Sequence, residues 1–269
     1  MAESGFSDAR GLRAACRSNK WRTQTSGLCP GFLQTNLVIL PKEYANDFKR
    51  FCELNKEPCP LVAILPPGQV EPSNLAKGAD VRTDLPMYNV YSKGQLIEQV
   101  PDIKHLFRDD MVSFFLGCSF SFERALQEAG VPVRNIDEGR NVSMYITNRP
   151  CIRSGPFHCD LVVTMRPVAP EKVELATEIT TKLTSAHGSP VHIGNPQEIG
   201  IQDLNKVDFG DAVTVHPGEI PVFWACGVTA ITSAISAKSD IVITHSPGHM
   251  FVADVPDTYL PEPSILNVL

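Results

Sequence analysis

The chain of 269 residues carries a formal net charge of −6, with 24 basic and 30 acidic side chains. Its composition, 43% hydrophobic and 20% charged, is typical of a globular protein and excludes disorder as the dominant state. No run of lysine and arginine is longer than a pair, and no apolar run approaches the ~20 residues of a membrane helix. We therefore expect neither nucleic acid nor a membrane as a partner.

The eight cysteines and the N-terminal segment bear on the cellular location. No CxxC pair occurs, and the cysteine spacing matches neither a zinc site nor the framework of a small secreted domain. We expect reduced thiols in a cytoplasmic protein, with no bound metal and no cofactor. The arginines near the N-terminus faintly resemble a transit peptide, which leaves the mitochondrial matrix as an alternative.

Hydrophobic periodicity predicts alternating strands and helices in the first half of the chain. A short basic helix near the N-terminus comes first. The elements after it are a strand at 36–40, a helix at 43–54, a strand at 61–65 and a hairpin at 88–99 that turns at 92–94.

A longer helix is predicted for 109–129. Val112, Phe115, Phe122 and Leu126 follow helical spacing, two aspartates stand at its start, and a glycine follows its end. The segment 117–119 divides this prediction into two shorter helices.

The second half of the chain continues the alternation. A strand at 161–165, a helix at 171–183 and a strand at 190–193 make a βαβ unit, whose crossover should be right-handed. The remaining elements are a strand at 221–224, a helix at 229–237 and strands at 240–244 and 251–255. This order predicts an α/β fold with a mixed sheet in a three-layer body. We expect that body to comprise 1–156 and 202–269, and 157–201 to form a smaller inserted α+β unit of two layers.

The segment 217–229 is the first candidate for substrate binding. A buried strand ends at Cys226 and Gly227, and a helix begins at Thr229. The backbone N–H groups at such a helix start can bind a carboxylate or a phosphate. The alternative is that Gly227 only permits a tight turn.

Histidines follow two of the predicted strands. His245 comes at a strand end, where α/β proteins place ligands, and is a candidate acid or base. Pro247 and Gly248 prevent His245 and His249 from sharing a helix face, so no zinc pair is expected. The alternative is a structural role for a buried histidine.

Another pair of histidines is five residues apart, one before the predicted strand at 190–193 and one within it. In an extended strand this spacing places His187 and His192 on opposite faces. A shared metal is therefore not implied, and His192 is a candidate for substrate binding.

Charged and thiol side chains add further candidates. Arg166, at a strand end, can clamp a carboxylate with two N–H groups, although pairing with a surface acid is an alternative. Arg82 and Asp84 either bind substrate or belong to an ion-pair cluster that stabilises a loop. Cys118, at a helix start, would have a lowered pKa and be reactive, although helix capping by Ser119 or Ser121 also explains this segment.

Seven of these segments resemble one known family. They occur in the order GFLQTNL (31–37), DVRTDLP (80–86), GCSFSFE (117–123), TMRP (164–167), HGSPVHIG (187–194), PGEIPVFWACGVT (217–229) and THSPGHM (244–250). The chain thus resembles the hydro-lyase family to which the N-terminal region of mitochondrial D-glutamate cyclase is similar, over about residues 9 to 254. The resemblance implies a two-part α/β architecture and a carbon–oxygen lyase activity, but no catalytic residues.

The sequence as a whole favours a hydro-lyase that acts on a small carboxylic or amino acid, with closure of D-glutamate to 5-oxoproline as one reaction. Glu219 and His245 are our candidates for the acid and base. Arg82, Arg166 and the helix start at Gly227 would hold the carboxylates. We expect all these groups to converge on one cleft between the body and the inserted unit.

Two other functions stay open at this point. One is a carboxylate-binding or regulatory module without turnover. The other is an amide hydrolase with Cys118 or Cys226 as the nucleophile. The expected partner is a small carboxylate or amino acid, and a homo-oligomer is an open alternative to a monomer.

Overall fold

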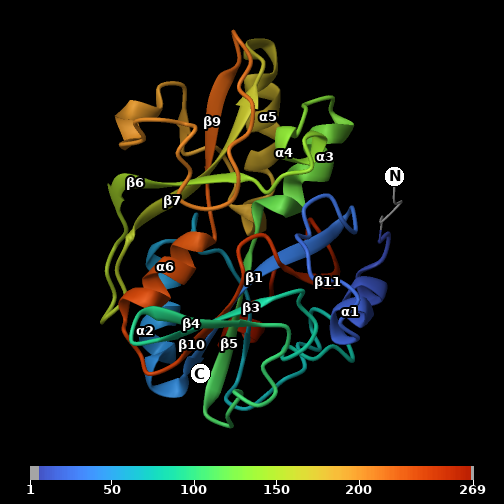
Figure 1. Cartoon of the computed structure of the whole chain (residues 1–269), viewed down its shortest axis with the longest axis vertical. Helices are drawn as coiled ribbons and strands as arrows, with labels where there is room; N and C mark the ends of the chain where they lie inside the picture. The colour runs from blue at the N-terminus through green and yellow to red at the C-terminus, as the bar shows by residue number, and fades with distance from the viewer. Residues whose placement is uncertain (1–5, 268–269) are drawn as a thin grey trace.

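Two β-sheets with helices on their faces make up the protein, which a computed structural model describes for residues 6–267. Figure 1 shows the larger sheet in the lower part of the molecule and the smaller sheet above it. The large sheet has the strand order β2 (Leu61–Leu65), β5 (Met111–Gly117), β1 (Phe32–Pro41), β10 (Val242–His245), β3 (Tyr88–Ser92) and β4 (Gln95–Val100), with β11 (Phe251–Pro256) also paired to β1. The small sheet has the order β6 (Ser143–Pro150), β7 (Asp160–Val168), β9 (Ile220–Ala225) and β8 (His192–Ile193).

Seven α-helices lie among the described residues, and several are short. They are α1 (Ala9–Arg17), α2 (Lys42–Leu54), α3 (Glu123–Glu128), α4 (Arg134–Asp137), α5 (Val173–Thr181), α6 (Val228–Ser236) and α7 (Pro263–Leu266). Figure 1 shows α3, α4 and α5 beside the small sheet. No helix in 6–267 combines the length and the apolarity that crossing a lipid bilayer requires.

Both faces of the large sheet are buried at its central strands. Successive side chains of a strand point to opposite faces, so Val38 and Leu40 pack with α2 and α6 on one side. Leu37 and Ile39 pack on the other side against the segment 66–87 and α7. A sheet covered on both faces explains why its central strands read as continuous apolar runs.

The predicted α/β class is confirmed, and the pairing within the sheets differs from the predicted mixed sheet. Every strand pair that the structure describes is antiparallel. In the small sheet, β7 and β8 both run antiparallel to β9, which lies between them. The predicted βαβ unit of β7, α5 and β8 therefore exists, with β9 inserted between its two strands.

The helix predicted for 109–129 is wrong in its first part. Residues Met111–Gly117 form β5, which lies between β2 and β1 and is buried throughout. A strand that is buried on both faces shows no polar alternation, so its apolar residues also fit helical spacing. Helical structure begins only with the 3₁₀ turn Ser119–Phe122 and continues as α3.

The predicted insert at 157–201 contains β7, α5 and β8. The strands β6 and β9, which pair with β7, lie outside that range. The division of the chain into a body and an inserted unit stays a prediction.

Candidate functional site

Two glycines mark close contacts between the large sheet and the segments that follow α5 and β9. A Cβ at Gly117 would overlap the carbonyl oxygen of Ser185, and a Cβ at Gly227 would overlap the amide of Asn36. Asn36 Nδ2 donates to the carbonyl oxygen of Gly117 at 2.7 Å. These positions need glycine because backbone and side chain approach more closely than a methyl group permits.

A buried ion pair lies next to this contact. Arg166 Nη2 on β7 donates to Glu123 Oε1 in the first turn of α3 at 2.9 Å, and each side chain is 2% exposed. The guanidinium also donates to Ser119 Oγ and Thr164 Oγ1, each at 3.3 Å. It lies over the ring of Phe122, 4.9 Å from the centroid, which adds a cation–π contact.

Glu123 has a second polar partner. Ser26 Oγ donates to Glu123 Oε2 at 2.9 Å. Burial raises the pKa of Glu123, although the charge and hydrogen bond of Arg166 oppose the shift. Burial thus favours the protonated form of Glu123, and Arg166 favours the carboxylate.

His187 is buried and has one ring nitrogen without a hydrogen-bond partner among the described residues. Its Nδ1 lies 2.7 Å from the carbonyl oxygen of Glu57, and a carbonyl can only accept, so Nδ1 carries the proton. Burial, assisted by the charge of Arg166, lowers the pKa of His187 to about 4. The imidazole is therefore neutral at pH 7, with an unprotonated Nε2.

Three buried polar atoms around this point have no hydrogen-bond partner among the described residues. They are Arg166 Nε, His187 Nε2 and Ser185 Oγ. Buried polar groups are nearly always paired, so a group of unpaired ones needs an explanation such as a ligand or a catalytic role. We call Arg166, Glu123, Ser119, Ser185 and His187 the Arg166 cluster.

Four of the predicted site residues lie near the Arg166 cluster. Cys118 and Cys226 are each 7% exposed and belong to the same apolar core. Gly227 contacts Asn36, and Thr229 Oγ1 accepts a hydrogen bond from the Val162 N–H at 3.0 Å. The side chain of Thr229 is therefore engaged with β7.

The expected low pKa of Cys118 is wrong. Burial raises the pKa of Cys118, and it raises that of Cys226 to about 11. Cys118 does lie at a helix start, and its Sγ accepts a hydrogen bond from the Phe120 N–H at 3.5 Å. Burial of the thiol outweighs this contact, because desolvation disfavours the thiolate. Both thiols are protonated at neutral pH.

Glu219 lies at the other end of β9. Seven residues separate it from Cys226, which is about 23 Å along an extended strand. Arg134 Nη2 donates to Glu219 Oε1 at 2.5 Å, and the His216 N–H donates to Oε2 at 2.7 Å. Burial acts to raise the pKa of Glu219, but these two contacts outweigh burial, and the pKa is lowered. Both carboxylate oxygens already have partners.

His245 uses its ring inside the large sheet. Its Nδ1 lies 3.1 Å from the backbone nitrogen of Leu37 on β1 and accepts that hydrogen bond. Burial lowers the pKa of His245 to about 4. The ring completes the hydrogen bonding of β1 between the positions where β10 and β11 pair with it.

The remaining predicted residues are engaged in contacts away from the Arg166 cluster. Arg82 pairs with Asp80 at 2.8 Å, and Asp84 pairs with Arg17 at 2.5 Å. Both pairs lie in or beside the segment 66–87 on the outer face of the large sheet. His192 Nε2 lies 2.7 Å from the carbonyl oxygen of Asn195.

The expected convergence on one cleft stays a prediction, and only part of the set lies close together in the interior. Arg166, Cys118, Cys226 and Gly227 lie together, whereas Glu219, Arg82, Asp84 and His192 do not join them. Glu123 and His187 belong to segments that the sequence singles out. Their spacing gives no sign of the buried contacts, because those contacts join segments far apart in the chain.

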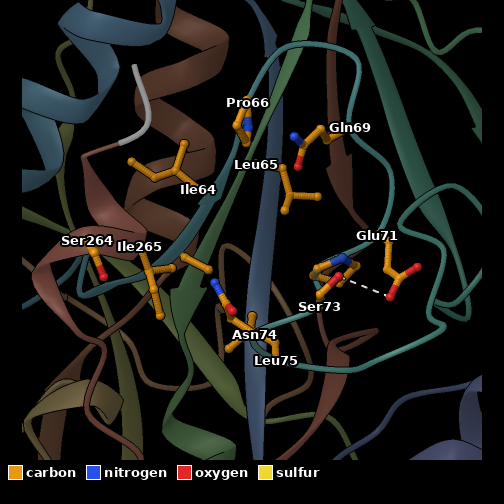
Figure 2. Close-up of a pocket in the computed structure, with 12 residues that line it drawn as sticks. Ile64, Leu65, Pro66, Gln69, Glu71, Ser73, Asn74, Leu75, Ser264 and Ile265 are labelled. Atoms are coloured by element: carbon orange, nitrogen blue, oxygen red, sulfur yellow. Dashed lines mark hydrogen bonds between the residues drawn. The ribbon is translucent and has the colours of Figure 1, made fainter.

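Cavities lie on several sides of the fold. Figure 2 shows one of about 290 Å³ beside β2 and α7, where Glu71 accepts from Ser73 Oγ at 3.0 Å. Another, of about 280 Å³, lies between the end of α2 and the C-terminal segment, and Ser185 of the Arg166 cluster lines it. Within 6–267, no three His, Cys, Asp or Glu side chains are grouped as a metal site.

Known proteins resemble this chain along most of its length. A relative from Syntrophobacter fumaroxidans, named "Putative hydro-lyase", is 52% identical over 94% of this chain and 97% of its own. Relatives of the same description from Bacillus licheniformis and Bacillus subtilis are 52% and 49% identical over 91% and 93% of this chain, and over 94% and 97% of their own.

A solved structure of a nitrogen repressor-like protein from Methanococcus jannaschii aligns with 91% of this chain and with 97% of its own chain. The sequence identity is 12% and the TM-score is 0.39. That similarity is too weak to bear on function. The D-glutamate cyclase family matches residues 112–254, a range that contains Glu123, Arg166 and His187. With that match and with relatives about 50% identical over nearly its whole length, the chain belongs to the D-glutamate cyclase family.

Proposed function

We propose that the protein is a carbon–oxygen lyase that acts on a small carboxylic or amino acid at the Arg166 cluster. The observation that carries the proposal is a pair of unpartnered buried atoms. One is Nε of Arg166, which pairs with Glu123, and the other is Nε2 of His187, whose pKa the Arg166 charge helps to lower. A cationic donor, a neutral base and a carboxyl group whose pKa burial raises are the groups that loss of water requires.

We propose D-glutamate as the substrate, in keeping with the family. The amine of the substrate attacks its side-chain carboxyl carbon, a C–N bond forms, a C–O bond breaks, and 5-oxoproline and water result. One proton leaves the amine, and one reaches the departing oxygen. In the substrate complex the substrate carboxylate replaces Glu123 as the counter-ion of Arg166, held by Arg166 Nε–H, and Glu123 is protonated. His187 Nε2 then takes the first proton, and Glu123 delivers the second.

The hydrolase alternative has less support. A cysteine nucleophile needs a thiolate, and burial raises the pKa of both Cys118 and Cys226. The acid and base predicted from the sequence also have other contacts, since Glu219 pairs with Arg134 and His245 bonds to Leu37. We therefore assign proton transfer to His187 and Glu123.

The proposal is tested by incubating the purified protein with D-glutamate and following 5-oxoproline by proton NMR, with loss of one water confirmed by mass. L-Glutamate, D-glutamine and small hydroxy acids form the comparison panel. We expect D-glutamate to be consumed fastest. If the whole panel stays unchanged while one acid raises the melting temperature, the protein binds carboxylates without turnover and the lyase proposal fails.

A further inference from the structure

Two cysteines face each other where the hairpin segment 151–159 leaves β6 and returns to β7. Pro150 lies opposite Asp160 in that pair, and the next step along the same register places Cys151 opposite Cys159. The Cys151 N–H donates to the carbonyl oxygen of Cys159 at 2.9 Å. Opposed residues of antiparallel strands have Cα atoms about 4.5–5.5 Å apart, which is within the range that a disulfide spans.

These two thiols are also the most accessible of the eight. Cys151 and Cys159 are half-buried, and the other six cysteines are buried. Cys151 lines a cavity of about 500 Å³, which Lys56 and Arg149 also line. Cys159 Sγ lies 3.3 Å from the carbonyl oxygen of Thr229, on the inner side of the pair. A small oxidant can therefore reach Cys151 before it reaches Cys159.

We propose that Cys151 and Cys159 form a reversible dithiol–disulfide site, which is oxidised by a low-molecular-weight disulfide such as glutathione disulfide. The Cys151 thiolate attacks one sulfur of the oxidant, a mixed disulfide forms, and one glutathione thiolate leaves. Cys159 then gives up its proton and attacks Cys151 Sγ, which releases the second glutathione. The protein loses two protons and two electrons, and one glutathione disulfide takes them up to become two glutathione thiols.

The electrostatics of the pair agree with this order of attack. A hydrogen bond from Cys159 lowers the pKa of Cys151, whereas the same interaction raises the pKa of Cys159. The thiolate is the reactive form, so Cys151 is the first nucleophile. The site does not depend on the reaction proposed for the Arg166 cluster.

The test is a titration of the folded protein with glutathione and glutathione disulfide mixtures, followed by alkylation and intact mass. We expect loss of two hydrogens and of two alkylatable thiols, both restored by dithiothreitol. Trypsin cleaves after Arg153, between the two cysteines, so the oxidised protein should yield a linked pair of peptides. A permanent glutathione adduct on wild-type protein, or a link to Cys52 or Cys59, overturns the proposal.

Three variants sharpen the result, each checked for folding by circular dichroism. Cys159→Ser should keep one glutathione on Cys151, because no thiol remains to release it. Cys151→Ser should lose the two-hydrogen change. Cys59→Ala is the control, since Cys59 is buried and is close enough to Cys151 and Cys159 for both to influence its pKa. It should oxidise as wild type does, and loss of the change in this variant contradicts the assignment.

Discussion

The guanidinium of Arg166 and the carboxylate of Glu123 form an ion pair with an N–O distance of 2.9 Å, in which each side chain is 2% exposed. Arg166 belongs to β7 of the small sheet, and Glu123 opens α3, directly after the turn that follows β5 of the large sheet. The pair thus connects the two sheets at the point where His187 Nε2 and Arg166 Nε lack partners among the described residues.

Glu123→Gln should destabilise the protein by about 3 kcal/mol, because it leaves the Arg166 charge buried without its counter-ion. Urea unfolding followed by circular dichroism measures the change. Glu178→Gln, which removes an exposed pair with Lys182, is the control and should leave the midpoint unchanged. Equal midpoints for Glu123→Gln and wild type would show that the buried pair contributes nothing to stability.

Stability should fall as the pH drops from about 6.5 to about 4. Burial lowers the pKa of His187 and of His245 from 6.5 to about 4, so the unfolded chain binds these protons first. A group whose pKa is lowered on folding favours the folded state above its unfolded pKa and loses that contribution below it. The loss amounts to roughly 3 kcal/mol for each histidine.

Urea unfolding at a series of pH values tests this prediction. His187→Asn should remove about half of the decline, because one of the two buried imidazoles is gone. His105→Gln, at an exposed position, should keep the wild-type slope. A flat profile between pH 6.5 and 4 in the wild type is incompatible with two buried neutral imidazoles.

Gly117→Ala should be strongly destabilising, by about 3 kcal/mol or failure to fold, because its methyl group would overlap the Ser185 carbonyl oxygen. Gly139→Ala is the matched control. Its backbone has a φ of +64°, but a Cβ there meets nothing within 4 Å, so only the modest strain of the left-handed conformation remains. If the two variants have the same melting temperature, the close approach at Gly117 is not a determinant of the fold.

The sequence predicted local structure well where one periodicity was clear. The helix expected at 43–54 is α2, the strand at 61–65 is β2, and the hairpin turns at Lys93 and Gly94 with φ values of 50° and 84°. It failed at β5, where burial on both faces removes the alternation that marks a strand. The strand β6 also has no counterpart among the predicted elements.

The candidate site was harder to predict than the elements. The sequence picked out Arg166, Cys118 and Cys226, which lie together, because glycines and polar residues follow strands there. It could not show that Arg166 pairs with Glu123, since 43 residues separate them and no local period links them. It also could not show that the ring of His245 bonds to Leu37, 208 residues away.

Cys118→Ala should retain turnover of the substrate. The thiol is buried and its pKa is raised, so it is protonated at neutral pH and unsuited to nucleophilic attack. Initial rates on the best acid of the panel measure the effect, and Cys226→Ala should behave in the same way. Complete loss of turnover in either folded variant would favour the cysteine hydrolase over the lyase.

The most direct test of the proposed function is the turnover of D-glutamate by His187→Asn compared with Glu219→Gln. Asparagine tolerates the left-handed backbone of His187, whose φ is 79°, but it cannot act as a base. We expect His187→Asn to lower kcat by about 10²–10⁴ with its melting transition preserved. Glu219→Gln should turn over at the wild-type rate, because Glu219 pairs with Arg134 at the other end of β9. Full activity in His187→Asn, or its loss in Glu219→Gln, would contradict the placement of the reaction at the Arg166 cluster.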